Sequence, residues 1–147
     1  MADTATLLKP ARVWTDGAMH DGWSVLVRGN RVGVAGANVE AGDAKVVDLA
    51  GLTLLPGLMD LHSHLFLHPY NETPWDDQVL KESEAYRTVR AVTHAAATLR
   101  AGFTTLRDLG TEGAGHADVA IKRAIEEGIV PGPRLFVVTR AIVATGT

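Results

Sequence analysis

Residues 54–64 read LLPGLMDLHSH, and this short stretch decides both the expected fold and the candidate site. A Pro-Gly pair interrupts an apolar run, so residues 58–65 are predicted to form an apolar strand that begins after a turn. Side chains two residues apart in a strand point to the same face, and His62 and His64 are therefore expected to project together. Two neutral imidazoles in this arrangement can bind one divalent metal ion, such as zinc.

Asp60 lies on the same predicted face, one step earlier in the strand. Its carboxylate could hydrogen-bond an imidazole and orient it, or it could serve as an ordinary buried hydrogen-bond partner. The His-x-His pattern is weak by itself, because six histidines in 147 residues produce such a pair by chance in a sizeable minority of chains. Two unrelated histidines therefore stay an alternative. The position of the pair favours a site, since α/β barrels place their active sites at the carboxyl ends of their strands.

The sequence after this stretch alternates between helical and strand patterns. Residues 68–78 are polar, contain two prolines and are predicted to be a loop. Apolar residues at spacings of three and four then predict a helix that ends at Gly102, with an inward face formed by Ala85, Val89, Val92, Ala96 and Leu99. A strand over 103–109, a helix over 118–127 and a strand over 135–138 follow. Such alternation implies right-handed parallel crossovers, and hence an α/β sheet or barrel.

The first fifty residues show a different pattern, in which short β-type runs are separated by turn signals. The runs cover residues 7–14, 23–28, 31–35 and 45–49. Gly29-Asn30, between two of these runs, predicts a tight hairpin. The sequence therefore predicts a small antiparallel sheet over residues 1–53 and the start of an α/β domain over residues 54–147.

Several polar residues near the expected carboxyl ends of the strands are further candidates for the site. Arg107 and Asp108 end the second parallel strand, where one of them could reach the rim of the site or the two could form a structural ion pair. His68 follows the first strand and could border a substrate. His94 and His116 are expected to be solvated or structural, and His20, at a turn of the β region, is assigned no role.

Two groups of side chains near the predicted first helix are expected to be mainly structural. The charged residues are predicted to form a solvated helix face: Lys81, Glu82, Glu84, Arg87 and Arg90. The aromatic residues are predicted to pack the preceding loop, where they could also line a substrate: Tyr70, Trp75 and Tyr86.

Composition and charge narrow the class of protein. The chain is 46% hydrophobic and 21% charged, which is enough apolar material for a real core. Its net charge of −3 and the lack of a basic patch argue against nucleic-acid binding. No apolar run reaches the roughly eighteen residues of a membrane span. The absence of cysteine excludes disulfides and thiolate metal sites and fits a reducing, cytoplasmic location. We also expect a homo-oligomer.

The final residues, 141–147, run out of a strand without a following helix. Three parallel strands with two helices leave an unpaired, half-covered sheet, whereas parallel sheets normally bury both faces. The pattern therefore predicts that the chain is truncated and that a missing barrel remainder or a complementing chain completes it. A small three-stranded α/β protein with a ragged tail is the alternative.

The stretch at 54–64 resembles the first barrel strand of the amidohydrolase superfamily. Residues 102–110 (GFTTLRDLG) are similar to the second strand of its imidazolonepropionase-like and Xaa-Pro dipeptidase-like branch, and residues 131–135 (PGPRL) resemble the approach to the third. The β segment before them, in which residues 48–51 (DLAG) lead into the barrel, resembles the N-terminal sandwich strands of the superfamily. The likeness covers nearly all of the chain.

This resemblance implies a distorted (β/α)8 TIM-like barrel flanked by a β-sandwich. It also implies one or two divalent metal ions, typically zinc, that activate water for attack on an amide or related C–N bond. By match to the family motif, His62 and His64 are ligands of the more buried metal ion. Later strands of the family supply a carboxylated lysine, two more histidines and an aspartate, and these positions are absent from this sequence. With two histidine ligands in place of the usual three protein ligands, the chain alone is expected to bind metal poorly and to turn over no substrate.

Three functions are compatible with these residues. The first, which the motif favours, is a metal-dependent hydrolase of dipeptides ending in proline or a cationic residue, of N-acyl amino acids or of cyclic amides. The second is a deaminase with a single metal ion, which the lack of a lysine at the end of the fourth strand would favour. The third is a short, non-catalytic binding module, which would be a metal-free species of 15.6 kDa.

Overall fold

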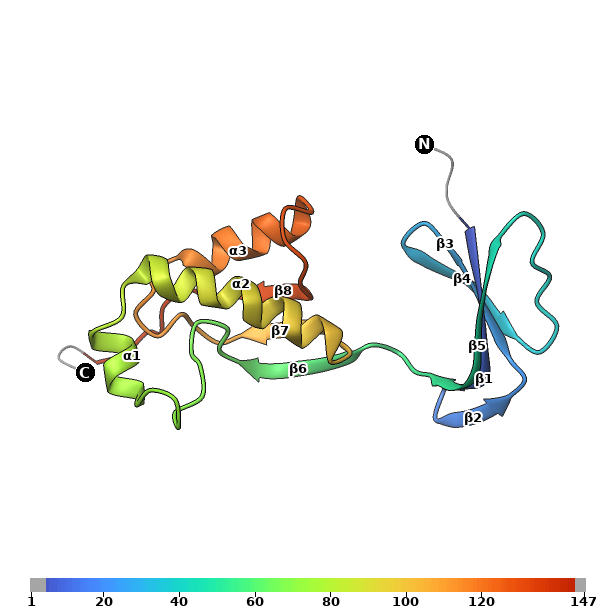
Figure 1. Cartoon of the computed structure of the whole chain (residues 1–147), viewed down its shortest axis with the longest axis horizontal. Helices are drawn as coiled ribbons and strands as arrows, with labels where there is room; N and C mark the ends of the chain where they lie inside the picture. The colour runs from blue at the N-terminus through green and yellow to red at the C-terminus, as the bar shows by residue number, and fades with distance from the viewer. Residues whose placement is uncertain (1–4, 145–147) are drawn as a thin grey trace. The chain divides into compact units, whose positions relative to one another are not determined.

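The computed structural model describes residues 5–144 of the chain. The chain divides into two compact units, Met1–Pro56 and Gly57–Thr147, and each unit has its own sheet (Figure 1). The end of the predicted open tail, Thr145–Thr147, lies outside the described residues. Within the described part, no helix is both long enough and apolar enough to cross a membrane.

The N-terminal unit is a five-stranded sheet built around one long strand. The strands are β1 (Ala5–Thr15), β2 (Ala18–Asp21), β3 (Ser24–Arg28), β4 (Arg31–Gly36) and β5 (Lys45–Leu54). The order β2-β1-β3-β4 is antiparallel throughout, and the predicted two-residue hairpin at Gly29-Asn30 joins β3 to β4. Gly29 has a φ of 55°, a left-handed conformation that such hairpin turns require and that glycine adopts without steric cost.

The prediction of a purely antiparallel sheet is wrong, because β5 pairs with β1 in parallel. The segment between β4 and β5 returns the chain so that β5 runs in the direction of β1. The predicted strand at 45–49 also extends to Leu54, since β5 pairs again with β1 after an irregularity between Pro10 and Arg12. Proline lacks the N–H that a regular ladder needs, which accounts for an irregularity at this place.

The C-terminal unit is an α/β structure with a three-stranded parallel sheet. Its strands are β6 (Leu58–Ser63), β7 (Phe103–Asp108) and β8 (Arg134–Val137), in the order β6-β7-β8. Its helices are α1 (Trp75–Leu80), α2 (Glu84–Arg100) and α3 (Ala117–Glu126). The predicted alternation of strand and helix is confirmed, and the unit forms the start of a parallel barrel preceded by sandwich strands.

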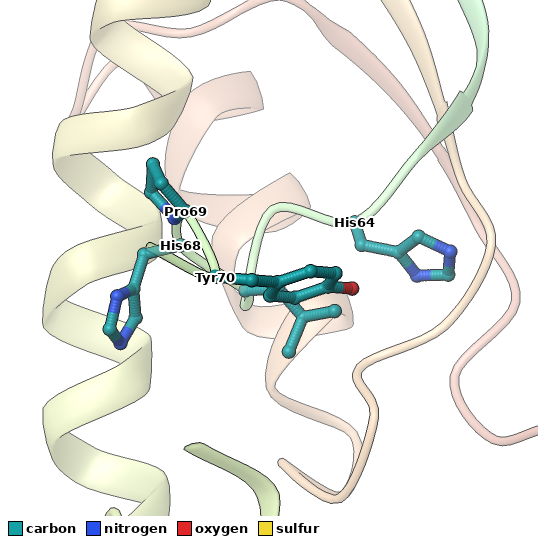
Figure 2. A pocket seen from close by; sticks show the side chains of 5 residues that line it. His64, His68, Pro69 and Tyr70 are labelled. Carbon is teal, nitrogen blue, oxygen red and sulfur yellow. The ribbon is translucent and has the colours of Figure 1, made fainter. Parts of the chain in front are cut away.

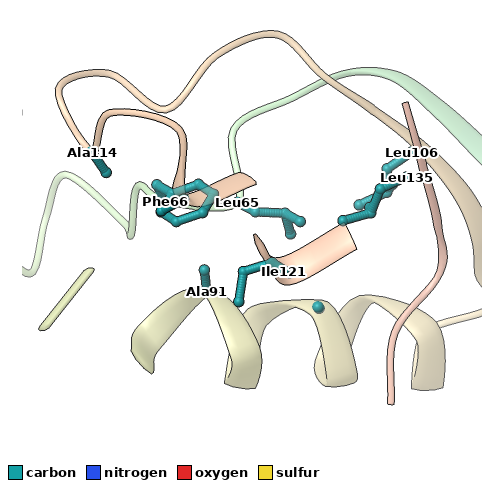
Figure 3. Close-up of a cluster of buried hydrophobic side chains, with 9 residues drawn as sticks. Leu65, Phe66, Ala91, Leu106, Ala114, Ile121 and Leu135 are labelled. Carbon is teal, nitrogen blue, oxygen red and sulfur yellow. The ribbon is translucent and has the colours of Figure 1, made fainter. Parts of the chain in front are cut away.

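Helices α2 and α3 cover one face of this sheet, and the core lies between them (Figures 1 and 3). Leu106 of β7 and Leu135 of β8 contribute the strand side of the core. Ala91 of α2 and Ile121 of α3 contribute the helix side, and Phe66 closes the core from the segment after β6. This packing fixes the carboxyl ends of β6 and β7, from which the candidate site is built.

Helix α2 forms where the spacing predicts it, but its inward face agrees only in part with the predicted one, of which Ala96 is buried and Val92 packs against the core. Ser83 caps the first turn by accepting a hydrogen bond from the Tyr86 N–H, which is the usual role of serine before a helix. The buried residues are Arg87, Ala91, Ala95 and Ala96, whereas Val89 is 66% exposed. Small residues let the helix approach the sheet closely, so the alanines mark the inward face better than the larger apolar residues.

The segment 68–78 is not a simple loop, because it contains the start of α1. This short helix begins after Pro74, whose φ of −54° suits the entry to a helix. Its one buried residue, Gln78, accepts a hydrogen bond from the His68 N–H and donates to the carbonyl oxygens of His68 and Thr73. The three aromatic residues predicted to pack this loop are largely exposed: Tyr70, Trp75 and Tyr86.

Candidate metal centre

His62 and His64 lie side by side at the carboxyl end of β6. Their ring centroids are 5.5 Å apart and the ring planes make an angle of 65°. The strand is irregular here: its register with β7 shifts between Asp60 and Ser63, and the His62 N–H donates to Asp60 Oδ1 at 2.9 Å. The carboxylate of Asp60 thus holds the main chain that carries the two histidines, whereas the sequence led us to consider a bond to an imidazole.

His64 is held in a defined orientation by a main-chain oxygen. Its Nδ1 lies 3.1 Å from the carbonyl oxygen of Gly110, in the segment after β7. A carbonyl oxygen can only accept, so Nδ1 carries the proton in this hydrogen bond and Nε2 of the neutral ring keeps its lone pair. Metal-binding histidines commonly donate their other N–H in this way. Glu112 Oε1 lies 3.8 Å from the same Nδ1 atom.

Asp108 is a fully buried carboxyl group at the end of β7, register partner of Ser63. Its pKa is raised to about 6, mainly by burial and also by the nearby Asp118, while the Gly110 N–H and His64 act in the opposite direction. Oδ1 accepts from the Gly110 N–H at 3.3 Å, and Oδ2 finds no hydrogen-bond partner among the described residues. An unpaired buried carboxylate oxygen is costly, and it is a suitable partner for a cation or a proton at this edge of the sheet.

The side chains of Arg107 and His68 make their contacts away from the histidine pair. Arg107 is exposed and donates from Nε to the carbonyl oxygen of Leu61 at 2.7 Å, so it joins β7 to β6 and forms no ion pair with its neighbour Asp108. His68 is buried, and its Nε2 lies 2.9 Å from Glu82 Oε1. Neither side chain reaches the two imidazoles of the pair by a hydrogen bond that the structure records for the described residues.

A cavity of about 280 Å³ lies beside His64. Its lining residues are His64, Leu67, His68, Pro69 and Tyr70. Figure 2 shows the ring of Tyr70 between the rings of His64 and His68, with its hydroxyl group toward His64. The cavity therefore places an exposed phenol next to the candidate ligand, while the ring of His68 turns to the other side.

Arg87 is the site-related residue that sequence reasoning missed, since it was predicted on a solvated face. It is 1% exposed, and its three nitrogen atoms each donate one hydrogen bond, to the carbonyl oxygens of Phe66, Thr111 and Glu112. Burial lowers the pKa of Arg87, and the charges of Glu82 and Glu112 oppose this effect. Its place four residues before Ala91, on the alanine face of α2, is the signal that could have found it.

The other histidines have structural surroundings. His94 Nδ1 lies 2.9 Å from the carbonyl oxygen of Leu65, and His20 stacks on Trp23 with ring centroids 3.8 Å apart. His116 precedes α3 and makes no capping bond with its side chain. For His94 and His116, the expectation of a structural or solvated role agrees with these positions.

The donor set fits part of a divalent metal site. Among the described residues, no three His, Cys, Asp or Glu side chains are grouped so as to hold a metal ion. The imidazoles of His62 and His64 are adjacent, and Nε2 of His64 keeps its lone pair. At the end of the neighbouring strand, Oδ2 of the buried Asp108 has no hydrogen-bond partner among the described residues. Nitrogen and carboxylate donors of this kind suit zinc and similar ions, which usually take three protein ligands at catalytic sites.

Comparisons with known proteins agree with this architecture. Among curated proteins, the dihydroorotase of Streptococcus thermophilus is 50% identical over 40 residues, which is 27% of this chain and 10% of that protein. A solved amidohydrolase structure matches with a TM-score of 0.78 and 33% identity, over 94% of this chain and 32% of its own. A solved Xaa-Pro dipeptidase with methionine in its active site matches with a TM-score of 0.82 and 27% identity, over 97% of this chain and 35% of its own. The chain thus spans about a third of the length of these structures.

A family model supplies the decisive match. The model of the amidohydrolase family covers residues 53–143, which is more than half of the chain. The matched range contains the histidine pair, the three parallel strands and all three described helices. The chain therefore belongs to the amidohydrolase family.

Proposed function

We propose that this chain supplies the first ligand-bearing strand of a metal-dependent hydrolase that cleaves the C–N bond of an amide or peptide. The observation that carries the proposal is the juxtaposition of His62 and His64 at the carboxyl end of β6, with a ring distance of 5.5 Å. Membership of the amidohydrolase family supports it. The same end of the strands carries the active site in (β/α)8 enzymes.

His62 and His64 would hold a divalent metal ion, with zinc as the first candidate and one or two ions in the complete site. When bound, such an ion polarises a carbonyl group and lowers the pKa of a water molecule toward neutrality. The carbonyl oxygen of Gly110 keeps the proton of His64 on Nδ1, so that the lone pair of Nε2 stays available to a metal ion. The carboxylate of Asp108 adds negative charge at the neighbouring strand end, where it favours a cation.

The proposed substrates are small molecules with an amide-type bond. A Xaa-Pro dipeptidase among the structural neighbours supports dipeptides ending in proline, and dihydroorotases among the sequence relatives support cyclic amides. Dipeptides ending in a cationic residue are also proposed. N-acyl amino acids complete the panel to be assayed. Specificity in such barrels comes largely from the loops that follow the strands, and the cavity beside His64 is formed by one of these loops.

Metal binding is the direct test of this proposal. The chain is titrated with Co²⁺, and the imidazole signals are followed by NMR in the wild type and in the variants His62→Ala and His64→Ala. Each variant is expected to weaken binding at least about tenfold, because a bidentate pair becomes a single ligand. His116→Ala, which removes an exposed histidine away from the pair, is the matched control and is expected to change nothing.

Unchanged Co²⁺ affinity in both pair variants would overturn the ligand assignment. When the chain forms part of a complete barrel, the zinc-loaded protein is assayed on the substrate panel for hydrolysis, and on amino-substituted heterocycles for release of ammonia. Hydrolysis of a member of the panel is expected. Ammonia release without amide cleavage would contradict the hydrolase and favour the deaminase.

A further inference from the structure

Arg87 joins two loops that leave neighbouring strands at the site. Its Nε donates to the carbonyl oxygen of Phe66 at 3.1 Å, in the segment after β6. Its Nη2 and Nη1 donate to the carbonyl oxygens of Thr111 and Glu112 at 2.8 and 2.7 Å, in the segment after β7. The side chain is 1% exposed, and none of the described carboxylates forms an ion pair with it. The bonding capacity of this buried guanidinium is therefore directed at main-chain oxygens.

The segment after β7 has a conformation that requires such support. Glu112 has a φ of 50°, in the left-handed region that residues other than glycine seldom adopt. A residue in this region persists where its surroundings hold it, and such residues are frequent at functional sites. The short bond from Arg87 Nη1 to the carbonyl oxygen of Glu112 supports this peptide, beside the bond from the Thr111 N–H to the carbonyl oxygen of Thr139.

The supported segment presents two oxygen atoms to His64. The carbonyl oxygen of Gly110 lies 3.1 Å from His64 Nδ1, and the carboxylate of Glu112 lies 3.8 Å from the same atom. Both residues are direct chain neighbours of Thr111, whose carbonyl oxygen accepts another hydrogen bond from Arg87. A shift of this segment would remove the acceptor that decides which nitrogen of His64 carries the proton.

We propose that Arg87 is a positioning residue for His64. By holding the carbonyl oxygens of Thr111 and Glu112 against the segment after β6, it keeps Gly110 in place as the acceptor for Nδ1–H. His64 Nε2 is thereby kept as the nitrogen that binds metal, a role that rests on the function proposed above. Lysine cannot replace arginine here, because one ammonium group cannot match the planar fork that reaches three carbonyl oxygens.

The tautomer of His64 tests the proposal without any metal. Long-range ¹H–¹⁵N spectra of the labelled chain are recorded at pH 8, where imidazoles are neutral. The wild type is expected to carry the His64 proton predominantly on Nδ1, and in Arg87→Lys the share of this form is expected to fall below half. A wild-type His64 protonated on Nε2, or a folded Arg87→Lys variant that keeps the Nδ1–H form, would overturn the proposal.

Two controls separate positioning from general stability. Arg90→Lys changes an arginine one turn along α2 that contacts Glu72 and Tyr86, and Ala97→Gly destabilises α2 at an exposed position through the low helix propensity of glycine. Both variants are expected to leave the tautomer of His64 unchanged, even where urea unfolding shows that they are destabilised as much as Arg87→Lys. If Arg87→Lys does not fold in buffer, its spectra are recorded in trimethylamine N-oxide, which favours the compact state without supplying hydrogen-bond donors.

Co²⁺ binding then distinguishes this proposal from the proposed function. Arg87→Lys is expected to weaken Co²⁺ binding about tenfold, the usual effect of disturbing a residue that orients a ligand. A changed tautomer with unchanged Co²⁺ affinity would uphold the positioning role and refute the metal-binding role of His64. Loss of Co²⁺ binding in His64→Ala together with an unchanged tautomer in Arg87→Lys would uphold the metal-binding role of His64 and refute the positioning role of Arg87.

Discussion

Gly57 approaches Thr104 so closely that no side chain fits between them. A Cβ atom on Gly57 would lie 2.1 Å from Thr104 Oγ1 and 2.7 Å from Thr104 Cβ. Rotation of the threonine side chain moves the oxygen but not Cβ, so the clash cannot be relieved by a change of rotamer. The Leu58 N–H donates to the carbonyl oxygen of Gly102 at 2.9 Å, which fixes the start of β6 beside the start of β7. The glycine of the Pro-Gly pair therefore permits the first parallel pairing of the sheet.

Gly57→Ala is expected to destabilise the C-terminal unit by about 1–3 kcal/mol, the range for overpacking at a site that cannot expand freely. Urea unfolding measures the change. The double variant Gly57→Ala/Thr104→Gly removes the opposing atoms and is expected to recover part of the loss. Gly36→Ala serves as a control, since its new Cβ would have only an ordinary contact at 3.9 Å. Equal losses in Gly57→Ala and Gly36→Ala would contradict the close approach.

Asp108 is expected to make stability depend on pH. Its pKa in the folded protein, about 6, lies above its ordinary value of 3.8, so the folded state binds the proton more tightly than the unfolded state. Ionisation of Asp108 therefore lowers the free energy of unfolding, by the full amount above pH 6. The free energy is recovered as the pH falls toward 4 and the carboxylate takes up its proton. The shift of about two pH units corresponds to about 3 kcal/mol.

Asp108→Asn removes this cost while keeping the shape of the side chain. The metal-free variant is expected to be more stable than the wild type at pH 7, with a difference that shrinks toward pH 4. Urea unfolding at several pH values measures both proteins. A difference that stays constant over this range would show that Asp108 does not titrate as its burial implies.

Gln78 is expected to hold the loop that carries the cavity beside His64. Its side chain satisfies the N–H and the carbonyl group of His68, at 2.9 Å each. Gln78→Ala leaves these buried groups without partners and is expected to cost about 1–3 kcal/mol. Amide hydrogen exchange should become faster in the segment around His68. Asp77→Ala removes only an exposed pair with Lys81 on the same helix and should cost less than about 1 kcal/mol.

The inward face of α2 can be tested with two substitutions of opposite size. Ala91 is fully buried against the sheet, and Val89 is 66% exposed. Ala91→Leu is expected to cost about 1–3 kcal/mol through overpacking, whereas Val89→Ala should stay within about 0.5 kcal/mol. Thermal unfolding compares the two variants. A larger loss of thermal stability in Val89→Ala than in Ala91→Leu would instead support the inward face that the spacing of large apolar residues predicts.

Apart from the short helix α1, which falls in a segment predicted to be a loop, the sequence alone predicts the strand and helix order of the C-terminal unit, because local periodicity determines it. The adjacency of His62 and His64 is also predictable, since two residues at positions i and i+2 of a strand lie together whatever surrounds them. The face of α2 is not predictable by the same reasoning, because Ala91 and a buried arginine carry little hydrophobic weight. Their inward position depends on how closely the helix approaches the sheet.

Other features depend on contacts between distant residues. The parallel pairing of β5 with β1 follows from the path of the connecting segment, which no local pattern encodes. The roles of Arg87 and of the Gly110 carbonyl group arise from loops that meet only in the folded chain. Sequence reasoning finds the candidate ligands for this reason, but it does not find the groups that orient them.

The hydrogen bond between His64 and Gly110 spans 46 residues, and this separation has a consequence for the order of assembly. The two imidazoles become neighbours as soon as β6 is extended, but the acceptor for Nδ1 arrives only after β7 has paired with β6. In the metal-binding role proposed above, an ion that meets the newly made chain would contact both histidines before the tautomer of His64 is set. Loading of the pair would then follow the docking of the second strand, and early metal exposure would compete with folding.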